Sequence, residues 1–135
     1  MEANKTINQK GIALVDDHPE IGELLKLRLN AAGIDQVRVF SSAAESLDDI
    51  IRNGPYLLTI TDFEMPGMNG QQLLEAISAL YPQSRVIIIT GNTDAAKSLP
   101  PACKVLIKGE TDFFTRLVNE IRQAQREQEQ KGSAG

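Results

Sequence analysis

The sequence predicts an α/β fold built on a doubly wound, five-stranded parallel sheet. Short runs rich in β-branched residues, bounded by turn formers, recur five times along the 135 residues, and stretches with helical spacing lie between them. Strands that alternate with helices form a mostly parallel sheet covered on both faces, because right-handed crossovers return each helix over the sheet. With 41% hydrophobic and 24% charged residues, the chain can bury the core of one such domain.

The five expected strands are short and mostly apolar. In chain order they are 12–15 (IALV), 37–40 (VRVF), 57–61 (LLTIT), 86–90 (VIIIT) and 105–107 (VLI). Continuously apolar runs are typical of central parallel strands, whereas the second run alternates through Arg38 and suits a sheet edge. We therefore expect the strand order 2-1-3-4-5, with a topological switch between the first and third strands, in a flavodoxin-like three-layer sandwich.

Three segments between strands and one after the last strand carry apolar residues at three- and four-residue steps, which indicates helices. Their apolar positions are Ile21, Leu24, Leu25 and Leu29; Ala43, Leu47, Ile50 and Ile51; Leu73, Leu74, Ile77 and Tyr81; and Phe113, Leu117, Val118 and Ile121. The remaining connection, 91–104, has room for only one or two helical turns before Pro100 and Pro101. A shortened or irregular fourth helix is expected there.

Composition limits the partners and the location. A formal charge of −4 and a pI near 5.0 give no basic footprint, so we expect no nucleic-acid binding by this chain itself. No apolar run approaches the ~20 residues of a membrane span, and the single cysteine, Cys103, suits the reducing cytosol. We expect a cytoplasmic protein with an N-terminal extension (1–10), one domain (11–125) and a polar helix end leading into a flexible tail or linker (126–135).

Polar residues follow four of the five strands, where each strand ends. Asp16 and Asp17 follow the first run, Asp62 the third and Lys108 the fifth, while Thr90 ends the fourth. These groups should meet in one cleft, because the carboxyl ends of parallel strands share one edge of the sheet. Three crowded carboxylates repel by about 4 kcal/mol per pair at an effective dielectric near 20, more than one lysine can offset. A hard divalent cation such as Mg²⁺, which prefers oxygen ligands, would relieve this repulsion.

Four motifs, in this order and spacing, resemble the receiver domain of two-component response regulators. They are LVDDHPEIGELL (14–25), TDFEMPGMNGQQLLEAI (61–77), VIIITG (86–91) and VLIKG (105–109), and the likeness runs from about residue 10 to 125. The resemblance implies that Asp62 accepts a phosphoryl group from a sensor histidine kinase or phosphotransfer protein. Such a domain catalyses its own phosphorylation and dephosphorylation but is mainly a signalling switch, which acts on an effector domain or a downstream protein.

The same resemblance implies a role for each site residue. Asp16, Asp17 and Asp62 would hold Mg²⁺ together with the backbone carbonyl of Glu64. Thr90 and Lys108 would bind the phosphoryl oxygens, and Thr90 would also take part in the switch. His18, the only histidine, is interpreted as an ordinary loop residue, because Mg²⁺ prefers oxygen.

The chain departs from the family pattern around its last two strands. Val105 occupies the signalling-switch position where many receivers carry a rotating tyrosine or phenylalanine, and Gly109 stands where many have a cis proline. The segment between Thr90 and Lys108 is also several residues shorter than usual. The chain could still form a dimer, but dimerisation through the surface around the fourth helix and fifth strand is not assumed. VDDHP, with a non-proline residue after the lysine, resembles receivers joined to a LuxR-type helix-turn-helix.

Two rival functions share this fold. A degenerate receiver would bind partners without phosphorylation, although the intact acidic set argues against it. A flavodoxin-type FMN carrier would want a hydroxyl-rich phosphate loop after the first strand, where the chain has DDHPE, and aromatic residues make up only 4% of it. Glycine-rich nucleotide loops are absent from the sequence.

Overall fold

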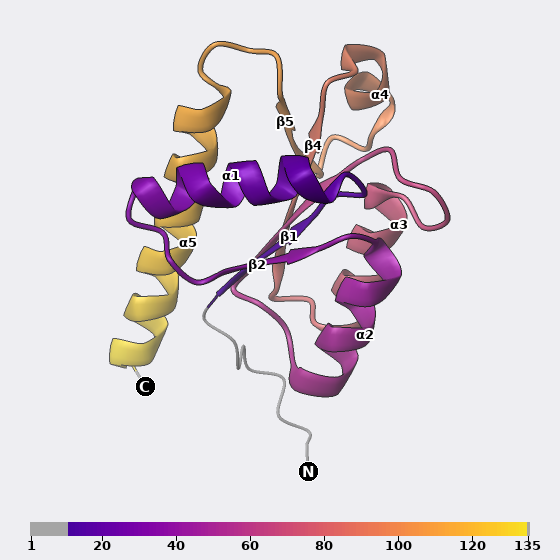
Figure 1. Cartoon of the computed structure of the whole chain (residues 1–135). Helices are drawn as coiled ribbons and strands as arrows, with labels where there is room; N and C mark the ends of the chain where they lie inside the picture. The colour runs from indigo at the N-terminus through magenta and orange to yellow at the C-terminus, as the bar shows by residue number, and fades with distance from the viewer. Residues whose placement is uncertain (1–10, 135) are drawn as a thin grey trace.

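The structure, a computed structural model, describes residues 11–134, with side chains to residue 130 (Figure 1). The predicted N-terminal extension, 1–10, lies outside the described residues. In chain order the elements are β1 (Ile12–Val15), α1 (Pro19–Ala31), β2 (Val37–Phe40), α2 (Ala43–Asn53), β3 (Leu58–Asp62), α3 (Gly70–Leu80), β4 (Arg85–Thr90), α4 (Thr93–Ser98), β5 (Lys104–Ile107) and α5 (Phe113–Ala134).

The five strands form one parallel sheet in the order β2-β1-β3-β4-β5, which confirms the predicted topology. β2 lies at one edge, and Arg38 on it is exposed, in agreement with its alternating pattern. The pairing brings the strand ends level: Val15 lies opposite Thr61, Asp62 opposite Ile89 and Thr90 opposite Ile107. Side chains that follow these strands are thereby delivered to one edge of the sheet.

Two apolar clusters fill the space between the sheet and its helices, which form three layers (Figure 1). α1 and α5 cover one face, where Leu29, Leu117 and Ile121 pack against the strands. α2 and α3 cover the other, where Ile50, Leu73 and Ile77 do the same. Burial of a large aliphatic side chain stabilises by roughly 1.5–3 kcal/mol, so each of these residues contributes substantially to the stability of the fold.

Short polar motifs set where the helices begin. The Ser42 hydroxyl accepts the Glu45 N–H at the start of α2, and Asn69 and Gln72 form a reciprocal capping box at the start of α3. The Asn92 side chain caps α4, which has six residues and no buried side chain. Pro100 follows the end of α4, as expected from the sequence.

The last helix is longer than the sequence predicts. α5 continues to Ala134, through the segment expected as a polar helix end and a flexible tail. Polar contacts tie this helix to the rest of the domain: Arg85 pairs with Glu127, and the Arg122 guanidinium donates to the Ala32 carbonyl at 2.6 Å. Despite its 22 residues, α5 is too polar to cross a bilayer, and no other helix of the described chain is long and apolar enough.

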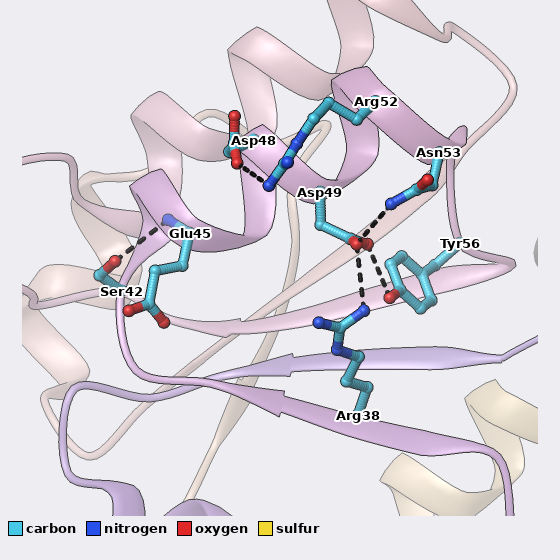
Figure 2. A network of polar contacts seen from close by, with 8 residues as sticks. All are labelled: Arg38, Ser42, Glu45, Asp48, Asp49, Arg52, Asn53 and Tyr56. Atoms are coloured by element: carbon cyan, nitrogen blue, oxygen red, sulfur yellow. Dashed lines mark hydrogen bonds and ion pairs between the residues drawn. The ribbon is translucent and has the colours of Figure 1, made fainter.

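A polar network built around the buried carboxylate of Asp49 ties α2 to the sheet (Figure 2). Arg38 and Asn53 donate to its Oδ1 at 3.0 and 2.9 Å, and the Tyr56 hydroxyl donates to its Oδ2 at 2.8 Å. Burial, and then the hydrogen bond to Asp49, raise the pKa of Tyr56. A buried carboxylate is tolerated only when it is paired and hydrogen-bonded. This network therefore fixes the position of α2 relative to β2 and to the segment just before β3.

Candidate functional site

The predicted site residues meet at the carboxyl edge of the sheet. Asp16 and Asp17 follow β1, Asp62 ends β3, Thr90 ends β4 and Lys108 follows β5. The strand ladder continues just past these ends, because the Lys108 N–H donates to the Thr90 carbonyl at 2.9 Å. This hydrogen bond fixes the backbone of Lys108 beside the end of β4 and so helps to position the lysine side chain.

A lysine and two buried acids form the centre of the site. The Lys108 Nζ lies 2.6 Å from the Asp62 Oδ1 and 4.0 Å from the Asp16 Oδ2. Asp62 is 7% exposed and Asp16 is 3% exposed, so both carboxylates are largely removed from water. A single ammonium therefore serves two buried acids, which leaves the site with an excess of negative charge whenever both are ionised.

The surroundings shift the protonation of Asp62. Burial is the main cause that raises the pKa of this carboxyl to about 6, and the neighbouring Asp16 carboxylate raises it further. Lys108 acts in the opposite direction through its hydrogen bond and its charge. Desolvation thus outweighs the ion pair, and the ionised form of Asp62 is held in an unfavourable environment.

Four side chains around this centre could share one cation. Asp16, Asp17, His18 and Asp62 each offer one ligand atom, and these atoms all lie within 4.8 Å of one another. The Asp17 Oδ1 is buried and has no hydrogen-bond partner among the described residues. Such an orphaned acceptor costs free energy unless something positive or proton-donating faces it. The donor set therefore fits a divalent cation with oxygen ligands.

The other predicted site residues lie around this cluster. Thr90 is buried, and its hydroxyl accepts the Asn92 N–H at 3.0 Å, which leaves its proton free to be donated elsewhere. The side chain of Glu64 is exposed and does not join the acidic cluster. Val105 is half-buried in β5 opposite Ile88. Gly109 follows the lysine, and residues 11–134 contain no cis peptide bond.

A close approach of α3 to Asp62 was not evident from the sequence. A Cβ on Gly70 would lie 2.4 Å from the Asp62 carbonyl oxygen and 3.0 Å from the Phe63 Cα, so only glycine fits without a backbone shift. The Gly70 N–H also donates to the Phe63 carbonyl at 2.9 Å. This packing role depends on tertiary contacts that sequence spacing does not report.

His18 lies closer to the acids than a plain loop residue would need to. Its backbone N–H donates to the Asp16 Oδ1 at 2.8 Å, and it occupies the N-cap position of α1 without a side-chain capping bond. The imidazole Nδ1 lies 3.2 Å from the Asp17 Oδ1. The only available sequence signal for this was its adjacency to two acids.

Comparison with known proteins agrees with the geometry. The family described as "Response regulator receiver domain" matches residues 12–124. The chain is 34% identical over 106 residues to the response regulator protein PilR of Pseudomonas aeruginosa, which covers 78% of this chain and 22% of PilR. It is 35% identical over 109 residues to the transcriptional regulator NtrC of Klebsiella pneumoniae, which covers 80% of this chain and 22% of NtrC. The chain thus spans about a fifth of the length of these relatives.

Solved structures show the same fold. Response regulator protein TrrA from Thermotoga maritima, crystallised in complex with Mg(2+)-BeF, superposes with a TM-score of 0.74 at 28% identity over 86% of this chain and 99% of that one. A receiver domain protein from Clostridium thermocellum gives a TM-score of 0.75 at 26% identity, covering 89% and 97% of the two chains. The likeness to receivers with a LuxR-type effector stays a prediction. The family match, the sheet order and the acidic edge of the sheet agree, and the chain belongs to the response regulator receiver domain family of two-component signalling.

Proposed function

We propose that this receiver takes a phosphoryl group from a histidine kinase or phosphotransfer protein onto Asp62, with Mg²⁺ bound beside it, and signals through the β4–α4 region. The observation that carries the proposal is the position of the Asp62 carboxylate. One of its oxygens faces the Lys108 ammonium at 2.6 Å, and Asp16 and Asp17 each bring a carboxylate oxygen within 4.8 Å of an Asp62 oxygen. The intact set of acids and lysine favours this function over a degenerate receiver.

The Mg²⁺ site would be made by side chains of Asp16, Asp17 and Asp62 and by the backbone carbonyl of Glu64. The orphaned Asp17 Oδ1 and the crowded carboxylates support this assignment. When bound, the ion would neutralise charge on the transferred phosphoryl group. The exposed Glu64 side chain is not needed for its role, because the backbone carbonyl is present whatever the side chain.

The chain's own residues have distinct tasks in the transfer. An Asp62 carboxylate oxygen forms the new bond to phosphorus as the phosphorus–nitrogen bond of the donor phosphohistidine breaks, and the donor imidazole leaves with the electron pair. The Lys108 ammonium, already positioned beside Asp62, stabilises charge on the equatorial phosphoryl oxygens. The buried Thr90 hydroxyl would donate its proton to one of the same oxygens.

Thr90 and Asn92 offer a route from the phosphoryl group to α4. The Asn92 N–H donates to the Thr90 hydroxyl, while the Asn92 side chain accepts the N–H groups of Asp94 and Ala95. A Thr90 drawn toward new negative charge would disturb the residue that caps α4. Because Val105 cannot act as a rotating aromatic, we propose that this capping contact carries the switch in its place.

Magnesium affinity should depend on pH through Asp62. The pKa of Asp62 is raised to about 6. The carboxyl is therefore mostly ionised at pH 7 and able to bind the ion, whereas below pH 6 protons compete with the ion for it. We expect an apparent Mg²⁺ affinity at pH 5 that is about tenfold weaker than at pH 7, measured by isothermal titration calorimetry. A flat affinity from pH 7 to pH 5 would show that Asp62 does not take part in binding.

The phosphodonor should dock on the outer face of α1. Ile21, Leu24 and Leu27 recur at three-residue steps there and are exposed, and Leu24 is 60% exposed. We propose that the loop after Lys108 completes this docking surface, because α1 begins just after Asp16 and Asp17. Leu24→Asp should slow transfer from a phosphorylated donor at least about tenfold but leave labelling by acetyl phosphate unchanged, because small phosphodonors need no docking surface.

A matched control for docking is available on α2. Ile51 is 57% exposed and lies on a different face, so Ile51→Asp introduces the same charge into a comparable environment. This variant should receive phosphate from the donor at the wild-type rate, followed by radiolabel transfer. Equal rates for Leu24→Asp, Ile51→Asp and the wild type would refute docking on α1.

The function is tested by adding beryllofluoride to the ¹⁵N-labelled protein with and without Mg²⁺. With Mg²⁺ we expect amide shifts at Asp62, Thr90, Asn92 and Lys108 and along α4, and few shifts without it. An unchanged spectrum with both reagents present would favour a degenerate receiver that acts without phosphorylation.

A further inference from the structure

The imidazole of His18 faces the acidic cluster from the solvent side. Its Nδ1 lies 3.2 Å from the Asp17 Oδ1 and 3.6 Å from the Asp16 Oδ1. The backbone N–H of the same residue donates to Asp16, which fixes the loop that carries the ring. The side chain is otherwise 62% exposed, so the ring can reach an ion in the cluster without losing a buried contact.

The contact between His18 and Asp17 is close without being a hydrogen bond. The Asp17 Oδ1 is buried and accepts no hydrogen bond, although the Nδ1 lies at ion-pair distance, 3.2 Å away. An oxygen and a nitrogen that can each offer a lone pair therefore lie side by side. Ligands at 2.0–2.2 Å from one ion are separated by roughly 3 Å when adjacent and roughly 4 Å when opposite. The observed spacings of 3.2 and 3.6 Å fall between these two values, so one ion could contact the ring and both carboxylates.

We propose that His18 is an additional metal ligand, which gives this site a preference for borderline first-row ions such as Zn²⁺ or Co²⁺ over Mg²⁺. Imidazole nitrogen suits such ions, whereas Mg²⁺ favours oxygen and would bind to the carboxylates without the ring. The inference rests on the proposed function, because it uses the same acidic cluster as its metal site. It deepens that function by naming a second class of ion that would compete with Mg²⁺ for the receiver.

One spectrum tests the ligand directly, because His18 is the chain's only histidine. In protein without a polyhistidine tag, Zn²⁺ should shift the ¹⁵N resonance of the imidazole Nδ1 far more than that of Nε2. Mg²⁺ at saturation should leave the Nδ1 resonance nearly unchanged. A Zn²⁺ titration that leaves Nδ1 unmoved, or that moves Nε2 instead, would overturn the proposal.

Affinities of two variants test selectivity. His18→Ala should weaken Co²⁺ binding at least about tenfold and change Mg²⁺ binding less than twofold, as measured by calorimetry. His18→Asn keeps a favoured residue at the N-cap of α1 and should also lose the Co²⁺ preference, which guards against a loss caused by helix fraying. Unchanged Co²⁺ affinity in both variants, or equal losses for Co²⁺ and Mg²⁺, would contradict the assignment.

The two hypotheses fail in different ways. If Mg²⁺ binds to the wild type but not to Asp17→Asn, while substitution of His18 leaves the Co²⁺ affinity unchanged, the magnesium site is supported and only the present inference is wrong. If Mg²⁺ does not bind at all, while Co²⁺ binds and depends on His18, the inference holds and the magnesium-dependent function fails.

Discussion

Asp62→Asn will not be labelled by acetyl phosphate, whereas the wild-type protein will gain one phosphoryl group in the presence of Mg²⁺. The amide nitrogen and oxygen keep the shape of the carboxylate but cannot supply the anionic oxygen that bonds to phosphorus. The Lys108 ammonium and the remaining acids stay in place around the substituted residue. Intact-mass measurement of both proteins checks the prediction.

The same variant should remain folded. The pKa of Asp62 is raised in the folded protein, so the fold binds this proton more readily than the unfolded chain does, and stability falls as the pH rises from the acid's ordinary pKa to about 6. At pH 7 the neutral amide removes that unfavourable charge, so the melting temperature should equal or exceed that of the wild type. Asp48→Asn, which alters an exposed acid paired with Arg52 on α2, should be labelled normally. Labelling of Asp62→Asn at the Asp48→Asn level would place the acceptor elsewhere.

Lys108→Ala should slow labelling by acetyl phosphate at least about 10²-fold. The variant loses the cation that lies 2.6 Å from Asp62 and that would stabilise the transferred phosphoryl oxygens. It also loses a group that lowers the pKa of Asp62, so less of the nucleophile is ionised at pH 7. Rapid-quench measurement of the acyl phosphate gives the rate.

The matched control for this change lies at the other end of β5. Lys104 pairs with Glu120 at 3.1 Å and is remote from the acids along the strand, so Lys104→Ala removes the same side chain without touching the site. It should be labelled at the wild-type rate. If Lys108→Ala and Lys104→Ala are equally fast, the lysine does not stabilise the transfer.

The parts of this fold that sequence could predict are those with a local or periodic cause. Strand order followed from the apolar runs and from Arg38, which marks β2 as an edge. The bounds of β1 and β2 agree with prediction. β3 begins and ends one residue later than expected, because Asp62 itself pairs with Ile89. The short α4 followed from the two prolines behind it.

Features made by distant residues were not predictable. The Asp49 network joins β2, α2 and the segment before β3. No spacing in the sequence predicts that Arg38 and Tyr56 both hydrogen-bond to the Asp49 carboxylate. Residues 126–135 were expected to form a polar helix end and a flexible tail or linker, whereas α5 continues to Ala134. In this segment, contacts such as Arg85 with Glu127 and the helix propensity of glutamine, glutamate and arginine favour helix.

The site shows the same division. The convergence of Asp16, Asp17, Asp62 and Lys108 follows from parallel strands, whose carboxyl ends must share an edge. The orientation of the His18 ring and the fit of Gly70 against the Asp62 carbonyl depend on the conformations of two loops. These loops are shaped by tertiary packing, which residue types alone do not specify.

The central claim is that the Asp62 side chain becomes an acyl phosphate when Mg²⁺ is present. Borohydride reduces an aspartyl phosphate to homoserine, so tandem mass spectrometry of the reduced, digested protein can locate the modified residue. After incubation with acetyl phosphate and Mg²⁺, we expect homoserine at position 62, and none when the metal is chelated. Homoserine at another aspartate, or its absence from every aspartate under both conditions, would contradict the account.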